Sequence, residues 1–408
     1  MPVDLRDPVR LLLDTVLADA RVHEEGAVAD YIPELANADP DALGIALVST
    51  RGVPHEAGDS GVEFTIQSVS KPFAYALALD LFGIDAVSEH VGLEPSGEPF
   101  NAISLDEASG RPMNPMINAG AIVTTSLLPG ATADEKFAVV RTGLERFAGR
   151  ELGVDEAVFA SEAATGDRNR ALAYLTRSAG TLGSTAEVAT TAYFRQCSVL
   201  VTARDLAIMA ATLATGGVNP VTGERVISED AARWTMAVMT GCGMYDASGT
   251  WLVRVGLPAK SGVGGGIVAV QPGQFGIGTF SPRLDARGNS VRGVAMLEAL
   301  SRDHGLHMLA HREEPLSPIG ALSRSDDGME TVAALRGELR FAAAEEVLTR
   351  LAPLVRDDGT LVLDFSSVTS VGPAATRLFR ALPGLLGPVE DRHIQVVLHD
   401  PEGVLDDD

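Results

Sequence analysis

The stretch Gln67-Ser68-Val69-Ser70-Lys71-Pro72-Phe73 places a lysine three residues after a serine. Residues three apart share one face of a helix, so the Lys71 amine can approach the Ser68 hydroxyl. Only three of the 32 basic residues in the chain are lysine, and arginine, unlike a buried lysine, cannot lose its proton in a protein. The spacing therefore predicts a serine nucleophile activated by a neutral amine, with a capped and solvated helix start as the alternative.

The size and charge of the chain narrow the classes of partner that it can bind. Its 408 residues exceed what one hydrophobic core usually supports, so two domains are expected. A formal net charge of −23 argues against nucleic acid or an anionic membrane as a partner. The first residues show no signal-peptide pattern, and the two cysteines, Cys197 and Cys242, fit a reducing compartment. We therefore expect a cytoplasmic protein.

Apolar patterns indicate the fold class of the larger part of the chain. Runs at 43–48 and 62–66 predict strands before Ser68, and further strand-like runs follow at 250–255 and 266–270. The residues between them, roughly 130–240, carry Ala-rich helical patterns. Strands at both ends with helices between predict one α+β unit whose sheet pairs distant segments.

A change of composition near residue 313 predicts a second domain. The stretch 313–327 is rich in Pro, Ser, Gly and acidic residues and is expected to be a linker between domains at 1–312 and 328–408. The second domain has an α/β pattern, with a helix, a strand, a helix and a strand expected at 342–354, 360–365, 374–382 and 394–398.

Four further segments have the composition of a binding site. Asn114 to Ile122 places two amides beside Pro and Gly, and Gly166 to Asn169 is a polar cluster before a helix. An Asx turn and a helix cap are the structural alternatives for these two segments. Gly241 to Asp246 and Lys260 to Gly266 are rich in glycine, but the second lacks the Gly-Lys-Ser/Thr ending of a phosphate-binding loop. It fits better a strand edge that exposes backbone N–H groups.

Together these segments, in this order, resemble the serine-dependent glutaminases from about Asp30 to Gly293. The resemblance implies a penicillin-binding-protein/β-lactamase-like fold, with a central antiparallel sheet and a helical part. It also implies hydrolysis of L-glutamine to L-glutamate and ammonia through a glutamyl-serine intermediate, with no cofactor. A homodimer or homotetramer is expected on the same ground.

The resemblance further implies a role for each matching position. Ser68 matches the nucleophile, Lys71 the residue that activates it, and Tyr245 a tyrosine that assists proton transfer. The backbone N–H groups of Ser68 and Val263 match the oxyanion hole. The substrate-binding positions are Tyr31, Gln67, Ser68, Asn118, Glu162, Asn169, Tyr193, Tyr245 and Val263.

The charges of these residues suit the substrate. Glu162 suits the ammonium group of glutamine, and Asn and Tyr donors suit its carboxylate. Lys260 opens a Lys-Ser-Gly triplet like that of β-lactamase-fold enzymes and is expected to support the site electrostatically. The third lysine, Lys136, is expected to be a solvated helix residue. Either Lys71 or Tyr245 could be the base for deacylation.

Residues 328–408 resemble a STAS domain, on the basis of Leu361 to Gly372 followed by a helix. Where that family often has a phosphorylatable serine, this chain has Gly372-Pro373-Ala374-Ala375, which argues against a phosphoserine switch. Docking of a protein or small ligand and a purely stabilising role both stay open.

Two other interpretations of the whole chain also stay open. A penicillin-recognising hydrolase of the same fold is disfavoured because no Ser-Asp-Asn triplet appears. A non-catalytic regulatory protein would act through the tail. No metal is expected, because no cysteine or carboxylate completes a site with the helically spaced His304, His307 and His311.

Overall fold

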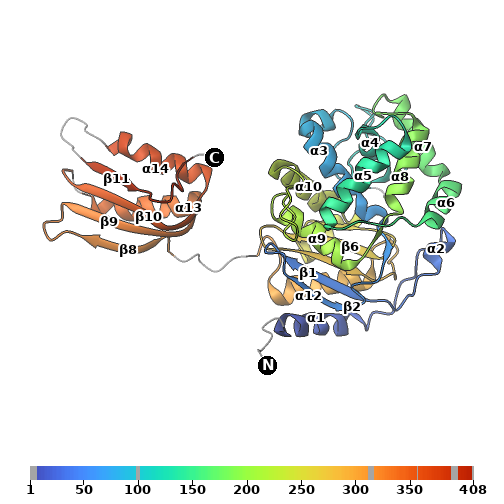
Figure 1. Ribbon diagram of the computed structural model, residues 1–408, viewed down its shortest axis with the longest axis horizontal. Helices are drawn as coiled ribbons and strands as arrows, with labels where there is room; N and C mark the ends of the chain where they lie inside the picture. The colour runs from blue at the N-terminus through green and yellow to red at the C-terminus, as the bar shows by residue number, and fades with distance from the viewer. Residues whose placement is uncertain (1–6, 98–101, 311–316, 356, 387–393, 407–408) are drawn as a thin grey trace. The chain divides into compact units, whose positions relative to one another are not determined.

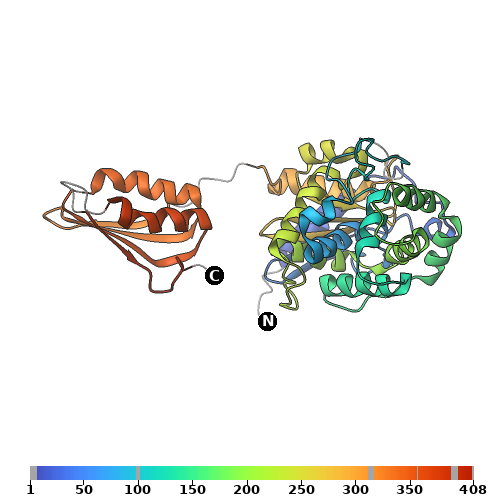
Figure 2. The same cartoon turned by 90° about the horizontal axis from the view of Figure 1, so that it is seen from above.

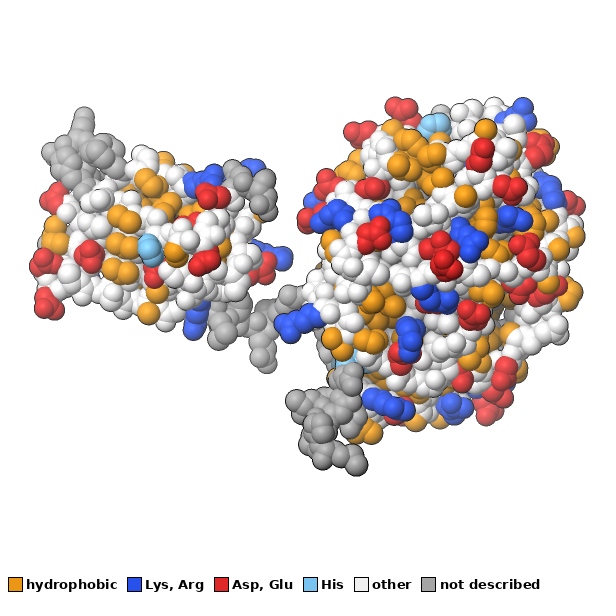
Figure 3. Space-filling view, in the orientation of Figure 1, with side chains coloured by type: hydrophobic (Ala, Val, Ile, Leu, Met, Phe, Trp, Pro, Cys, Tyr) orange, Lys and Arg blue, Asp and Glu red, His pale blue; other side chains and the backbone are white. Residues whose placement is uncertain are grey.

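The computed structural model describes residues 7–97, 102–310, 317–355, 357–386 and 394–406. The chain divides into two compact units, Met1–Ala310 and His311–Asp408, each with its own hydrophobic core (Figure 1). On the face of the first unit seen in Figure 3, acidic and basic side chains are interspersed rather than gathered into one patch. No helix in the described ranges is both long and apolar enough to cross a bilayer.

A five-stranded antiparallel sheet lies at the centre of the first unit, with strand order β2-β1-β7-β6-β5. Its strands come from both ends of the unit, as the apolar runs predicted. They are β1 (Gly44–Ser49), β2 (Pro54–Gly58), β5 (Ala259–Ser261), β6 (Gly266–Gln271) and β7 (Phe275–Phe280). The α+β class expected from the sequence is confirmed.

Helices cover both faces of this sheet (Figure 1). On one face α1 (Asp7–Ala20) and α12 (Val291–His304) pack through Leu13, Met296 and their neighbours onto β1, β6 and β7. On the other face α9 (Ala203–Ala214) lies directly on β7. A Cβ atom at Gly276 would meet the Ala207 carbonyl oxygen at 2.3 Å, so the close approach of helix and strand requires glycine.

The remaining helices form the helical part beside the sheet (Figure 2). They surround α3, whose residues Phe73, Tyr75 and Ala76 are fully buried. The larger ones are α3 (Lys71–Ser88), α4 (Asn118–Leu127), α5 (Ala133–Ala148), α6 (Glu156–Thr165), α7 (Asp167–Ser178), α8 (Ala186–Cys197) and α10 (Glu229–Cys242). Shorter elements are α2 (Pro33–Ala36), η1 (Gln67–Ser70), η2 (Tyr245–Ala247), α11 (Ser248–Arg254) and the paired strands β3 (Phe64–Thr65) and β4 (Leu200–Val201).

The second unit is a four-stranded mixed sheet of order β11-β10-β9-β8 with two helices on one face (Figure 2). Strand β10 pairs in parallel with β9 and β11, and β8 pairs antiparallel with β9. The rings of Phe365 and Phe379 meet edge to face at 5.2 Å between centroids. The elements are β8 (Ile319–Arg324), β9 (Glu330–Leu339), α13 (Phe341–Leu351), η3 (Ala352–Leu354), β10 (Thr360–Val371), α14 (Pro373–Leu386) and β11 (Gln395–His399).

Part of the expected linker is a strand of the second unit. Within 313–327, the described residues include β8, which continues through a tight turn into β9. The turn uses the residues that suggested a linker: Gly328 has φ 68°, and Asp327 accepts a hydrogen bond from the Met329 N–H. The prediction of a linker is therefore wrong for this described part, because turn-forming residues serve a hairpin as readily as a linker.

Two other expectations are also corrected by the structure. The strand-like run 250–255 lies mostly in helix α11, where the Trp251 indole N–H donates to the Leu257 carbonyl at 2.7 Å. Lys136 is buried rather than solvated, and its amine donates to the carbonyls of Ser126, at 2.8 Å, and Leu128. It thus satisfies carbonyl groups at the C-terminal end of α4.

Candidate active site

Ser68 lies in the short turn η1 that connects strand β3 to helix α3. Gln67, immediately before it, has φ 47°, a left-handed conformation that non-glycine residues rarely adopt. The turn is held by hydrogen bonds from the Ser70 hydroxyl to the Gln67 carbonyl, at 2.7 Å, and from the Gln196 amide to the Ser70 hydroxyl, at 3.0 Å. Surrounding contacts thus maintain a strained backbone beside Ser68, which is the situation often found at functional sites.

Lys71 begins helix α3 one helical turn after Ser68 and is 1% exposed. Its amine donates to the side-chain oxygen of Asn118 at 2.7 Å and to the carbonyl of Met116 at 3.3 Å. Burial lowers the pKa of Lys71 to about 7, with the nearby Cys197 opposing this shift. A substantial fraction of the Lys71 amines is therefore neutral near neutral pH and able to accept a proton.

Tyr245, Lys260 and Ser261 form a buried group beside the serine. The Tyr245 hydroxyl donates to the Ser261 carbonyl at 3.0 Å, and burial raises the pKa of Tyr245, although its hydrogen bond with Ser68 opposes the shift. The Lys260 amine lies 4.1 Å from the centroid of the Tyr245 ring. Burial lowers the pKa of Lys260 far below its ordinary value, and the charge of Lys71 lowers it further. Tyr245 also has positive φ, at 57°, and so shares with Gln67 a conformation found in no other described non-glycine residue.

A pocket of about 280 Å³ opens in front of Ser68. Glu162 lies within it, where burial raises the pKa of the carboxyl group while hydrogen bonds from Tyr31 and Gln67 oppose that shift. The Tyr31 hydroxyl donates to Glu162 at 2.8 Å. The residues that line the pocket are Tyr31, Gln67, Ser68, Asn118, Glu162, Thr165, Gly166, Arg168, Asn169, Tyr193, Cys197 and Val263.

Asn118 links the Lys71 amine to Asn169 and Tyr193, two residues that line this pocket. While its oxygen accepts from Lys71, its amide N–H donates to the side-chain oxygen of Asn169 at 3.0 Å. The Tyr193 hydroxyl lies 3.4 Å from the same Asn118 oxygen. A ligand in the pocket would therefore contact groups that also hold the Lys71 amine in place.

The backbone at Val263 is pressed against the turn that carries Ser68. Val263 lies between β5 and β6, and a Cβ atom at the preceding Gly262 would lie 3.2 Å from the Val69 nitrogen and 2.9 Å from its side chain. A Cβ atom at Gly264 would meet the Thr65 carbonyl at 2.5 Å. Glycine at both positions lets the Val263 backbone approach the first turn of η1, which carries the Ser68 N–H.

The structure brings most residues predicted from the sequence into one place. Eight of the nine predicted substrate-binding residues line the 280 Å³ pocket, and the ninth, Tyr245, is hydrogen-bonded to Ser68 and lines a second pocket. Lys71 and Lys260 are buried behind these residues. Four lining residues were not predicted as binding residues: Thr165, Gly166, Arg168 and Cys197. The polar segment Gly166 to Asn169 was a signal for Arg168, whereas nothing in the sequence distinguished Cys197, a buried thiol whose pKa burial raises to about 12.

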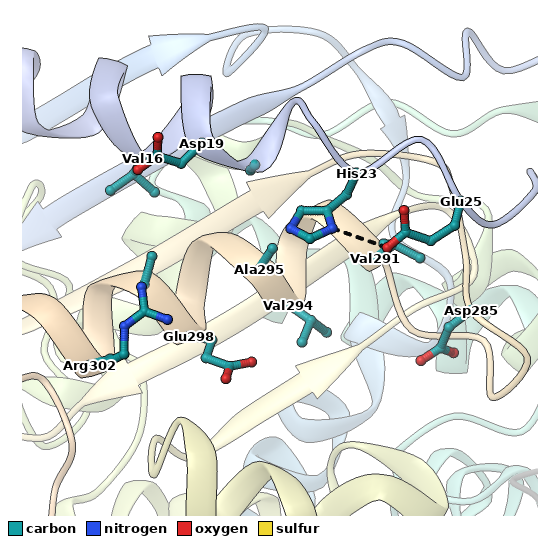
Figure 4. Close-up of a pocket in the computed structure, with 12 residues that line it drawn as sticks. Val16, Asp19, His23, Glu25, Asp285, Val291, Val294, Ala295, Glu298 and Arg302 are labelled. Carbon is teal, nitrogen blue, oxygen red and sulfur yellow. Dashed lines mark hydrogen bonds and ion pairs between the residues drawn. The ribbon is translucent and has the colours of Figure 1, made fainter.

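A larger pocket lies elsewhere, between α1 and α12, and holds none of the predicted site residues. This groove of about 480 Å³ is lined by Asp19, Glu298 and Arg302 among others, and in it His23 pairs with Glu25 at 3.1 Å (Figure 4). The smaller pocket, not this groove, contains Ser68 and the buried polar groups around it. Within the described ranges, no group of three His, Cys, Asp or Glu side chains could hold a metal ion, and His311 lies outside those ranges.

Several known proteins are similar to this chain in both sequence and fold. A family model described as glutaminase matches residues 26–309. Glutaminase 1 of Bradyrhizobium diazoefficiens is 48% identical over 91% of this chain, which spans 64% of that protein's length. The glutaminase of Corynebacterium glutamicum is 44% identical over 98% of this chain and 96% of its own. A crystal structure described as Mglu in its glutamate form has a TM-score of 0.87 and 40% identity, covering 97% of this chain and 99% of that one. The chain belongs to the glutaminase family.

Proposed function

We propose that this chain hydrolyses L-glutamine to L-glutamate and ammonia through a glutamyl ester on Ser68. The observation that carries the proposal is the Ser68/Lys71 pair beside a pocket that contains one carboxylate, Glu162, and several amide and hydroxyl groups. The glutamate form of the related Mglu structure agrees with a glutamate-sized ligand.

The first step is attack by the serine. The neutral Lys71 amine takes the proton of the Ser68 hydroxyl, directly or through Tyr245, and the oxygen attacks the side-chain amide carbon of glutamine. The N–H groups of Ser68 and Val263 stabilise the oxyanion, and one such donor contributes about 3 kcal/mol to the transition state. The proton held by Lys71 then passes through Tyr245 to the leaving nitrogen, and the C–N bond breaks to give ammonia and the glutamyl ester on Ser68.

The part of the pocket around Glu162 selects the substrate. Glu162 pairs with the substrate ammonium, whose charge favours the ionised carboxyl group that burial disfavours. Asn169, Tyr193 and Arg168 supply donors for the α-carboxylate. A site built from buried hydrogen-bonding groups rejects analogues that leave those groups unpaired.

The test is glutamate formation from L-glutamine by the wild type and by Ser68→Ala. We expect the wild type to release equal amounts of glutamate and ammonia, and Ser68→Ala to lose at least about 10³-fold in kcat. Wild-type protein that is folded yet inert with glutamine across pH and ionic conditions would overturn the proposal. Hydrolysis of nitrocefin without ammonia release would favour the penicillin-recognising alternative.

For the second unit we propose a STAS-like module that takes no part in the chemistry. The order of its elements and its mixed sheet support the likeness, and every residue assigned to the site belongs to the first unit. Gly372 to Ala375, before and within the first turn of α14, offer no hydroxyl for phosphorylation. The homo-oligomer and the cytoplasmic location stay predictions from the sequence.

A further inference from the structure

Two pockets meet at the contact between Ser68 and Tyr245. Ser68 lines the 280 Å³ pocket, whereas Tyr245, which is hydrogen-bonded to Ser68, lines a separate pocket of about 350 Å³. The consecutive residues Ile117 and Asn118 also line different pockets: Ile117 lines the second pocket, and Asn118 lines the first. The second pocket is therefore connected to Ser68 through Tyr245, and Glu162 does not line it.

The geometry of the tetrahedral intermediate indicates a function for this second pocket. Its carbon carries four groups: the Ser68 oxygen, the oxyanion, the rest of the substrate and the leaving nitrogen. The oxyanion points to the Val263 N–H, and the rest of the substrate extends toward Glu162. The nitrogen is left to point toward Tyr245, which lines the second pocket.

We propose that the second pocket is the leaving-group and nucleophile subsite: ammonia departs through it, and the nucleophile that cleaves the glutamyl ester enters through it. This inference rests on the proposed function. By microscopic reversibility, water attacks from the direction in which ammonia left. The glutamyl chain meanwhile fills the first pocket, so the second pocket is the open route to the ester.

The same geometry admits small neutral amines in place of water. The amine nitrogen forms a bond to the acyl carbon, the bond from that carbon to the Ser68 oxygen breaks, and the proton lost by nitrogen passes to that oxygen through Lys71 or Tyr245. The product is a γ-glutamyl amide. The lining of the pocket is mostly apolar, with a few polar side chains such as Asn114, Thr240 and Ser248, so it suits small neutral nucleophiles such as water, ammonia and hydroxylamines.

Two glycines allow the pocket to be filled without disturbing the catalytic residues. Gly241 in α10 and Gly249 in α11 both line it. A Cβ atom at Gly249 would meet nothing within 4 Å, and one at Gly241 would meet only the Pro95 side chain at 4.0 Å. Leucine is a good helix former, so Gly241→Leu and Gly249→Leu are expected to fold. Gly384→Leu is the matched control, since it is also a helical glycine facing open space but lies in the second unit.

The experiment compares steady-state kinetics of the full chain and its variants with L-glutamine. In Gly241→Leu or Gly249→Leu we expect kcat to fall about tenfold, equivalent to about 1.4 kcal/mol. We expect KM to fall with it, and intact-mass analysis to show a glutamyl adduct that Gly384→Leu does not accumulate. Thr240→Leu provides a third filling variant if either glycine variant is unfolded by circular dichroism.

The second measurement compares the γ-glutamyl products formed with two nucleophiles of different size. Hydroxylamine and O-benzylhydroxylamine are both neutral near pH 7.5 and differ mainly in size. We expect the wild type to form γ-glutamyl products with both, and the filled variants to lose the benzyl product preferentially. Folded filled variants with wild-type kcat and wild-type product ratios, or a wild type that transfers to neither nucleophile, would overturn this inference. A wild type that does not hydrolyse glutamine would instead overturn the proposed function.

Discussion

At the scale of single residues, the proposed reaction depends on a lysine that can lose its proton. Because burial lowers the pKa of Lys71 to about 7 and the neutral amine is the reactive form, kcat/KM should rise as pH increases through about 7 and then level off. Lys71→Arg keeps a positive charge that cannot be lost and should lower kcat/KM by about 10²–10⁴. Initial rates of glutamate formation between pH 5.5 and 9 measure both effects.

The matched control is Lys136→Arg. Lys136 is also buried, but its amine only donates to backbone carbonyls, so the folded variant should keep the wild-type pH profile and most of its activity. A Lys71→Arg variant with wild-type activity, or a wild-type profile that falls as pH rises through 7, would show that Lys71 is not the base.

The sequence predicted Lys71 and Ser68 because helical spacing is a local property. It misjudged Lys136, whose neighbours Asp134 and Glu135 are exposed, because its burial depends on the end of a different helix. For the same reason Cys197 could not be predicted to line the pocket.

At the scale of elements, the turn between β5 and β6 positions the predicted oxyanion hole. In Gly262→Ala the new Cβ would lie 2.9 Å from the Val69 side chain and 3.2 Å from the Ile66 carbonyl, so the turn must move away from Ser68. Losing one oxyanion donor should reduce kcat by about 10²–10³ with a smaller change in KM. Steady-state kinetics beside thermal unfolding separate this effect from a loss of folding.

Gly61→Ala is the control for this prediction. Its Cβ atom would meet nothing within 4 Å, and its φ is not positive, so neither kcat nor the unfolding temperature should change. Wild-type kcat in a folded Gly262→Ala would mean that the Val263 N–H is not a donor to the oxyanion.

Elements were predicted well where the sequence pattern allows one structure only. The β1 and β6 runs are short, apolar and bounded by turn residues, and both are strands. The run 250–255 is equally apolar but belongs to α11, because a short apolar run fits a buried helix as well as a strand. Which of the two forms depends on packing partners that are distant in the sequence, here α12 and the end of β5.

At the scale of the whole molecule, the two units have separate cores and only one contains the site. The core of the second unit is formed from its own residues, including Leu335, Leu363 and Phe379. The family match also ends at residue 309. The contacts within the chain divide it after Ala310, and the hairpin that follows in the second unit could not be distinguished from a linker by composition.

A chain that ends at Ala310 should therefore fold and keep its activity. It retains both hydrophobic clusters of the first unit and every residue assigned to substrate binding or catalysis. We expect kcat and KM for L-glutamine within about twofold of the full chain, because no element that positions the site is removed. Circular dichroism and thermal unfolding measure folding, and the same measurements on residues 317–408 expressed alone test the second core. A truncated chain that aggregates would mean that the second unit stabilises the first. A folded but inactive one would mean that the tail acts on the site.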